Sequence, residues 1–256
     1  MILSRVIGHF RKQEWTAIFL DFVIVVAGIL IAFQITEWNT ARQDRAREIS
    51  YLTRIRADLQ GDIDGLAERQ RYWADVAAAG RMATGYAETG ALVDGSAWKT
   101  VRSFFWASNV WFYSPNDTAF SEMSGAGDVT LIRSEKLRIA LSNYYSNSAK
   151  IVRAVVYTAI PAYRQAVRGA TPIAVASYIV NECHSHGPVN QRMLDCPAPV
   201  SEAEAAKILE VYLAHPLLVD GLRFWITNLD QLAQSVEPDT AAATALAAAI
   251  DSELAK

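Results

Sequence analysis

The sequence predicts an all-α protein: one N-terminal transmembrane helix that continues into a long helix and a helical-bundle soluble domain. Two observations lead to this fold class. Residues 16–36 form an apolar run of about 20 residues, the length that crosses a bilayer as a helix. After residue 40, apolar residues recur at three- and four-residue steps, which is the spacing of one helix face.

Composition and charge set the class of protein. The chain has 256 residues, of which 52% are hydrophobic and 20% charged, a composition typical of a globular protein rather than a disordered one. The formal net charge of −3 gives no reason to expect a nucleic-acid partner. We divide the chain into a short basic N-terminal arm (1–15), a transmembrane helix (16–38) and a helical soluble domain (39–256).

The apolar run is predicted to stay in the membrane. Trp15 and Trp38 bracket it and suit the two interfaces of a bilayer, which makes lipid the first expected partner. The run is longer than the core of a cleaved signal peptide, and no small-x-small cleavage pattern follows it. The basic arm before it fits either an interfacial helix or the simple flank of a signal anchor.

One stripe of the predicted membrane helix carries a carboxylate and two small residues. Asp21, Gly28 and Ala32 fall within about 20° of one line at 100° per residue. Small residues four apart let two helices approach closely, and an ionisable residue at membrane depth is a functional hypothesis by default. We expect association here with a second copy or another membrane protein. Alternatively, Asp21 reaches water at the boundary and Gly28 is incidental.

The membrane helix is predicted to continue into the soluble domain, because no helix breaker follows until Gly61. Gly61 and Gly65 are expected to bend this long helix. Its apolar face is predicted to comprise Ile49, Leu52, Leu59, Ile63, Leu66 and Trp73.

The middle of the chain is predicted to alternate connections and helices. Residues 80–100 are expected to form a connection, and the aromatic stretch 104–113 to contribute most to the core. A helix is predicted from a Ser114 cap to Gly125, followed by a turn with a short extended piece. Ser134 is predicted to cap another helix that Pro161 kinks or ends.

Residues 171–200 are predicted to break the helical pattern, with a polar loop at 183–200. The loop holds Cys183, His184, His186 and Cys196. A disulfide between the two cysteines is favoured in an oxidising compartment. Unpaired thiols and a zinc site made of the two cysteines and two histidines are the alternatives, although neighbouring Cys183 and His184 would strain a tetrahedral site.

The C-terminal part is predicted to be helical again. Ser201 and Glu204 have the spacing of a capping box. Pro216 and Pro238 bracket the most regular apolar stripe of the soluble domain, and the alanine-rich end after 240 is a closing helix or a frayed tail. The stripe consists of Leu218, Leu222, Trp225, Leu229, Leu232 and Val236.

Three segments together resemble an uncharacterised bacterial family of single-pass membrane proteins: GILIAFQITEWN (28–39), YLTRIRADLQ (51–60) and TAFSEMSGAGDVTLIRSEKLRIALSNYY (118–145). The resemblance implies a GILIAxQxxxWN membrane-exit motif with Gln34, Trp38 and Asn39, and a later helix that closes in a Tyr144–Tyr145 pair. Interfacial anchoring of Gln34, Trp38 and Asn39 and packing of the two tyrosines are the favoured explanations. The family has no assigned activity, so the resemblance transfers no catalytic residue.

No sequence motif for catalysis is found: there is no phosphate-binding loop, dinucleotide fingerprint, HExxH or G-x-S-x-G pattern. The acid pair Asp62/Asp64 is interpreted as solvated. We therefore expect no enzyme and no cofactor, but an interaction, scaffold or sensory module of the bacterial inner membrane, with a cytoplasmic N-terminus and a periplasmic main domain. The alternative is a membrane-anchored hydrolase or metal-dependent enzyme that uses the loop 183–196.

Overall fold

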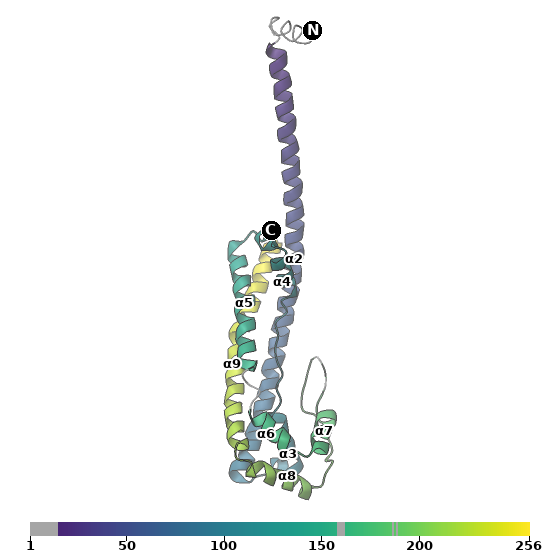
Figure 1. The fold of residues 1–256 in the computed structure, drawn as a ribbon, viewed down its shortest axis with the longest axis vertical. Coiled ribbons are helices and arrows are strands. Elements are labelled where there is room, and N and C mark those ends of the chain that lie inside the picture. Colours follow the sequence, from purple (N-terminus) through teal and green to yellow (C-terminus); the bar gives the residue numbers. More distant parts are fainter. Residues whose placement is uncertain (1–14, 158–161, 186, 188) are drawn as a thin grey trace. The chain divides into compact units, whose positions relative to one another are not determined.

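The computed structural model describes residues 15–157, 162–185, 187 and 189–256 (Figure 1). It is 81% helical, and no strand forms within these residues. An isolated antiparallel bridge joins His184 to Met193. The predicted all-α fold class is therefore confirmed.

The chain divides into two compact units, Met1–Leu52 and Thr53–Lys256, and each is described here by itself. In the first unit, the described residues belong to helix α2 (Trp15–Thr89). An 18-residue window of this helix has a mean hydropathy of 2.6, and none of that window is buried. By length and composition the helix can therefore cross a membrane. Of the predicted basic arm, only Trp15 lies within the described residues.

In the second unit, α2 runs on to Thr89 without a break at Gly61 or Gly65. Its buried side chains follow the predicted stripe in part, since Ile49, in the first unit, is 40% exposed. The absence of a side chain at these two glycines lets the segment that holds Tyr113 and Asn116 approach α2 closely. A Cβ added at Gly61 would lie 2.8 Å from Asn116 Nδ2, and one at Gly65 would lie 3.3 Å from the Tyr113 ring.

The predicted connection at 80–100 is wrong over most of its length. Helix α2 continues to Thr89, a 3₁₀ turn η1 covers Val93–Gly95, and helix α3 spans Ala97–Ala107. The Ser96 hydroxyl accepts a hydrogen bond from the Lys99 amide, which caps α3 in a way that the glycine- and alanine-rich sequence obscures. The aromatic stretch supplies the core as predicted in its first half, where Phe104, Phe105 and Trp106 are buried, but Phe112 is 46% exposed.

The next helix begins later than predicted. Helix α4 spans Thr118–Gly125, so it ends at the predicted glycine but does not start at the Ser114 cap. Acids of α2 explain the difference. Asp62 accepts the Asn116 amide at 2.7 Å, and Asp58 accepts the Ala119 amide at 3.0 Å. The predicted extended piece after the turn is wrong too, because η2 (Asp128–Leu131) is a 3₁₀ helix.

Helices α5 (Glu135–Tyr157) and α6 (Ala162–Ala170) follow. The Ser134 hydroxyl accepts the Leu137 amide at 3.3 Å, so the predicted cap is confirmed. Pro161 lies outside the described residues. The expectation that the helical pattern breaks from residue 171 is wrong for its first part, because α7 spans Ile173–Glu182.

The C-terminal helices are α8 (Glu202–Ala214) and α9 (Leu218–Leu254). The capping box of Ser201 and Glu204 is confirmed, with both of its reciprocal hydrogen bonds present. Helix α9 passes through Pro238 and contains the alanine-rich end, so this end is a continuation of the helix. All six residues of the predicted stripe are buried: Leu218, Leu222, Trp225, Leu229, Leu232 and Val236.

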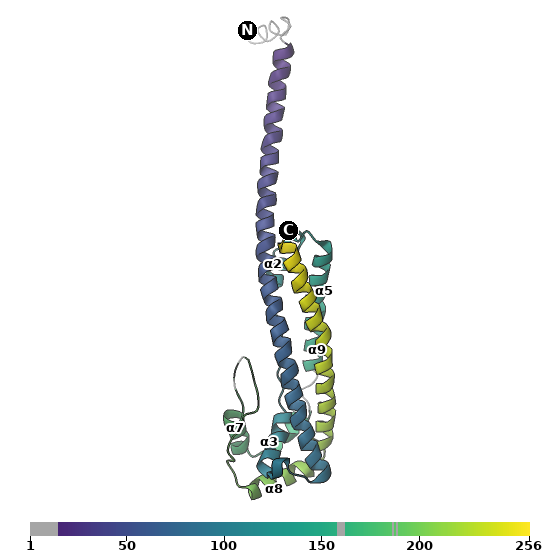
Figure 2. The same cartoon turned by 180° about the vertical axis from the view of Figure 1, so that it is seen from behind.

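The core of the second unit lies where α3 packs against α8, α6 and α7, while α9 packs against α5 and α6 (Figures 1 and 2). The indole N–H of Trp225 in α9 donates to the Ala107 carbonyl at the end of α3 at 2.9 Å. The Tyr163 hydroxyl of α6 donates to the Phe104 carbonyl. These bonds satisfy buried polar groups inside an aromatic core.

Candidate functional site

The three residues of the predicted association stripe lie on α2 in the first unit. Asp21, Gly28 and Ala32 are all exposed, and a Cβ added at Gly28 would meet nothing within 4 Å. The Ala32 carbonyl accepts a hydrogen bond from the Thr36 hydroxyl at 2.9 Å. The stripe is therefore open along its length, and its association with another helix stays a prediction.

The residues of the predicted membrane-exit motif follow on the same helix. Gln34, Trp38 and Asn39 are exposed, and Trp38 is 65% accessible. The guanidinium of Arg42 lies 5.8 Å from the centre of the Trp38 ring, within range of a cation–π contact. Such a pair suits a membrane interface, where an aromatic ring and a cation share the polar boundary. The anchoring role of this motif stays a prediction.

A buried carboxylate is the polar centre of the second unit. Asp62 of α2 is fully buried, so its interpretation as a solvated acid is wrong. One carboxylate oxygen accepts the Asn116 amide, and the other accepts the Tyr144 hydroxyl at 2.9 Å. The carboxylate thus joins α2 to α5 and to the segment before α4. These hydrogen bonds offset the desolvation free energy of the buried acid, because each supplies a donor that replaces water.

Burial is the main cause of the pKa shifts around this carboxylate. It raises the pKa of Asp62 above the ordinary 3.8, while the hydrogen bonds from Asn116 and Tyr144 act in the opposite direction. Burial and the nearby Asp62 charge raise the pKa values of Tyr113 and Tyr144. The tyrosines therefore stay neutral hydroxyl groups at physiological pH.

The Tyr144–Tyr145 pair of the resemblance divides into two roles. Tyr144 donates a hydrogen bond to Asp62, whereas Tyr145 stacks on Phe120 with ring centres 4.7 Å apart. The Tyr145 hydroxyl is buried and has no hydrogen-bond partner among the described residues. Packing therefore accounts for the second tyrosine, and hydrogen bonding accounts for the first.

The polar loop begins and ends at a disulfide between Cys183 and Cys196, whose Cα atoms are 5.2 Å apart. The Leu194 amide donates to the Cys183 carbonyl, and the His184 ring packs edge-on against Trp106 with centres 4.8 Å apart. His186, the fourth residue of the zinc alternative, lies outside the described residues. Across the part of the chain that is described, no three His, Cys, Asp or Glu side chains gather where they could hold a metal ion.

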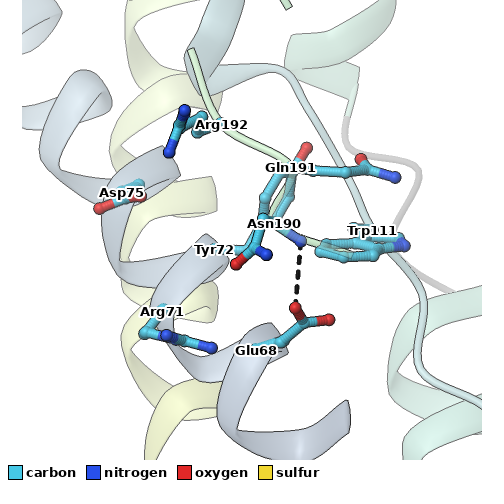
Figure 3. Close-up of a pocket in the computed structure, with 8 residues that line it drawn as sticks. All are labelled: Glu68, Arg71, Tyr72, Asp75, Trp111, Asn190, Gln191 and Arg192. Atoms are coloured by element: carbon cyan, nitrogen blue, oxygen red, sulfur yellow. Dashed lines mark hydrogen bonds between the residues drawn. The ribbon is translucent and has the colours of Figure 1, made fainter. Parts of the chain in front are cut away.

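This loop closes over α2 to form a pocket (Figure 3). One side consists of four α2 residues: Glu68, Arg71, Tyr72 and Asp75. Trp111 and the loop segment 190–192 complete the lining, and the cavity volume is about 120 Å³. The Asn190 amide donates to Glu68 Oε1 at 3.0 Å, as the dashed line in Figure 3 marks. Asn190 has φ of 56°, in the left-handed region that asparagine tolerates better than most residues.

Aromatic rings and arginines form the wall behind this pocket. The Tyr72 ring contacts Trp111 with centres 5.2 Å apart, and the Arg69 guanidinium lies 3.4 Å from the centre of the Trp111 ring. Burial raises the pKa of Tyr72 to about 12, although the positive charges of Arg164, Arg168 and Arg69 act to lower it. The phenol of Tyr72 therefore lies in the field of three arginines.

Two of these arginines are held by neutral oxygens. Arg164 donates to the Ser108 carbonyl at 2.6 Å. Arg168 donates to the Ser108 hydroxyl and to Asn109 Oδ1, and its guanidinium lies 4.6 Å from the centre of the Phe105 ring. Burial lowers the pKa of both arginines, that of Arg168 to about 10. Sequence analysis missed this pair: the spacing of four is visible in the sequence, but the partners in Ser108 and Asn109, more than 50 residues away, are not.

Comparison with family models gives a match. The model of a family described as a family of unknown function (DUF6090) matches residues 21–159, which is more than half of the chain. No curated protein and no solved structure matches the chain. The expected resemblance to an uncharacterised family is thus confirmed. Asp62 and Tyr144 lie inside the matched range, whereas the disulfide loop lies beyond it.

Proposed function

This chain belongs to DUF6090, a family of unknown function, and from its own residues we propose that it is a single-pass, membrane-anchored helical module. It acts by contact with other proteins, as a scaffold or sensor, rather than by catalysis. In this proposal the N-terminus lies in the cytoplasm and the residues after Asn39 lie in the periplasm of a bacterium.

The exposure of the apolar helix carries this proposal. Phe19, Phe22 and Phe33 are each more than 60% exposed, within a window whose mean hydropathy is 2.6. Leaving one such side chain in water rather than burying it costs about 1.5–3 kcal/mol. A run of this length cannot stay solvated in a stable protein, and lipid around a helix removes the cost while the helix satisfies its own backbone.

The disulfide supports the orientation. Bonds of this kind form and persist in oxidising compartments and are rare in the cytosol. A bond between Cys183 and Cys196 therefore favours a periplasmic location for the second unit. The basic residues do not decide the matter, because arginines flank the span on both sides: Arg5 and Arg11 before it, Arg42 and Arg45 after it.

Extraction of membranes at alkaline pH tests the anchor. Full-length protein should stay with the membrane pellet after a carbonate wash, whereas a variant with Phe22, Ile24 and Ile31 all replaced by lysine should appear in the supernatant. Protease added to spheroplasts should degrade the second unit, because the periplasmic side is then accessible. A second unit that stays intact would indicate the reversed orientation. Release of the unchanged protein by carbonate would refute the proposal.

The association stripe is tested separately. We propose that Asp21→Leu lowers the mass of the full-length protein in mild detergent from an oligomer toward a monomer. Gln34→Leu is the matched control, because Gln34 is exposed on the same helix but lies on a different side from Asp21. Equal monomeric masses for all three proteins would remove self-association from the proposal and leave the anchor intact.

A further inference from the structure

Positive charge gathers around Tyr72 in a protein whose net charge is negative. Arg71 and Arg192 line the pocket, while Arg69, Arg164 and Arg168 act on the Tyr72 phenol behind it. Two acids line the same pocket, Glu68 and Asp75. The lining alone is neutral, with two arginines and two acids. The three arginines behind it, of which Arg69 lies 3.9 Å from Glu68, bring the local charge to +3, whereas the whole chain carries −3. Such a local reversal of charge favours an anionic ligand.

Among the described residues, no acid forms an ion pair with Arg164 or Arg168. The two guanidinium groups bond instead to oxygens of Ser108 and Asn109. These oxygens lie at the C-terminus of α3, where the helix dipole supplies about −0.5 of a charge. That offsets about a quarter of two positive charges. Charges that are partly buried are normally paired, so most of this pair remains uncompensated.

The lining of the pocket contains hydrogen-bond donors that have no partner among the described residues. The side chains of Arg71 and Arg192 form no hydrogen bond or ion pair with any described residue, and both lie at the cavity in Figure 3. The Tyr72 hydroxyl likewise has no hydrogen-bond partner in the described residues. The cavity volume of about 120 Å³ is well above the roughly 10–15 Å³ that one water needs, so there is room for a compact polyatomic ion.

The acids in the lining narrow the choice of anion. Glu68 accepts the Asn190 amide and lies 3.9 Å from Arg69 Nη1, whereas Asp75 forms no hydrogen bond or ion pair within the described residues. A fully deprotonated anion would be repelled by Asp75, whereas an anion that keeps one proton can donate a hydrogen bond to it. Monohydrogen phosphate has such an O–H group at neutral pH, and sulfate has none.

We propose that the pocket between α2 and the disulfide loop binds a protonated oxyanion of the phosphate class. The guanidinium groups of Arg71 and Arg192 hold its oxygens, the Tyr72 hydroxyl donates a further hydrogen bond, and Asp75 accepts the proton of the ligand. Guanidinium forks suit this geometry because they can present two parallel N–H groups to two oxygens. This role goes beyond membrane anchoring and does not depend on it.

Calorimetric titration of the full-length protein in a nonionic detergent with inorganic phosphate, at constant ionic strength, tests the site. We expect the Arg71→Gln/Arg192→Gln variant to bind phosphate at least tenfold more weakly, since two charge-assisted hydrogen bonds are lost. Arg81→Gln is the matched control, because Arg81 lies on the same helix and pairs with exposed Asp230 away from the pocket. Its affinity for phosphate should equal that of the wild type.

Two further arms identify the ligand. Asp75→Asn should reduce the preference for phosphate over sulfate, because the repulsion of sulfate is removed. Glycerol phosphate represents an esterified headgroup: tighter binding of the ester indicates a lipid or metabolite ester, and tighter binding of inorganic phosphate indicates the free ion. Unchanged phosphate affinity in the Arg71/Arg192 variant would overturn the proposal. So would the absence of heat and of ³¹P line broadening at about 10 mM phosphate, which corresponds to a binding free energy weaker than about −3 kcal/mol.

Discussion

The hydroxyl of Tyr144 donates a hydrogen bond of 2.9 Å to the carboxylate of Asp62, 82 residues earlier in the chain. Both side chains are buried, so this bond links α2 to α5 inside the second unit. It also places one of two adjacent tyrosines in a polar role and leaves the other, Tyr145, in an apolar one. The effects of removing the two hydroxyl groups on stability can therefore be compared within one protein.

Replacement of Tyr144 by phenylalanine should lower the free energy of unfolding by about 1.5–3 kcal/mol, the usual range for a hydrogen bond to a charged group. Tyr145→Phe is the control. Its buried hydroxyl has no partner among the described residues, so its removal should be neutral or slightly stabilising. Urea unfolding of the full-length protein in detergent, followed by tryptophan fluorescence, measures both. Equal losses would contradict the assignment.

The raised pKa of Asp62 predicts a specific dependence of stability on pH. The folded state holds the carboxyl proton more tightly than the unfolded state, whose pKa is near the ordinary 3.8. The contribution of Asp62 to the free energy of unfolding is therefore fully present below pH 3.8 and is lost as pH rises through the folded pKa. The stability of the wild type minus that of Asp62→Asn should decline over this window. A constant difference across the window would contradict the shift.

Substitution of Gly61 should reveal the close approach of Asn116. Alanine normally stabilises a helix interior by about 0.5–1 kcal/mol relative to glycine. A Cβ at Gly61 would lie 2.8 Å from Asn116 Nδ2, which also bonds to Asp62, so Gly61→Ala should destabilise by about 1–3 kcal/mol. Gly85→Ala, in the same helix with nothing within 4 Å, should be stabilising. Thermal melts measure both variants. If Gly61→Ala and Gly85→Ala changed the melting temperature by the same amount, the close packing at Gly61 would be wrong.

Loss of the disulfide should destabilise the second unit. The bond closes a loop with a sequence separation of 13, for which the chain-entropy model gives about 3 kcal/mol. Cys183→Ser should lower the urea midpoint, and dithiothreitol should lower the midpoint of the wild type to the same value without affecting the variant. A wild-type midpoint that does not respond to reductant would show that the bond contributes nothing to stability.

The helices that sequence analysis located are those whose apolar spacing is local. The stripe of α9 and the capping box of Ser201 and Glu204 each depend on residues a few positions apart, so the sequence displays them directly. The start of α4 was misplaced because the Ala119 amide in its first turn and the Asn116 amide just before it bond to Asp58 and Asp62, more than 50 residues away. Spacing within one segment cannot reveal a cap supplied by another helix.

The candidate site likewise combines a feature that local sequence shows with contacts between distant segments that it does not show. The cysteines that close its loop are visible as a pair in the sequence, but the pocket itself depends on contacts between distant segments. The Asn190 amide meets Glu68 across 122 residues. Asp62 was interpreted as solvated for this reason too, since its spacing from Asp64 says nothing about Tyr144. Helix α7 was missed because it is short, at 10 residues, and is bounded by Pro172 and the loop.

Pro238 lies inside α9, between the buried stripe and the alanine-rich end. Proline has no amide hydrogen, so the backbone ladder of α9 lacks one rung at this position. Fraying that starts at the C-terminus can stop there, because the residues before Pro238 keep their own ladder and their buried stripe. The alanine-rich stretch should therefore exchange its amide hydrogens as a separate and faster unit than the stretch that holds Trp225.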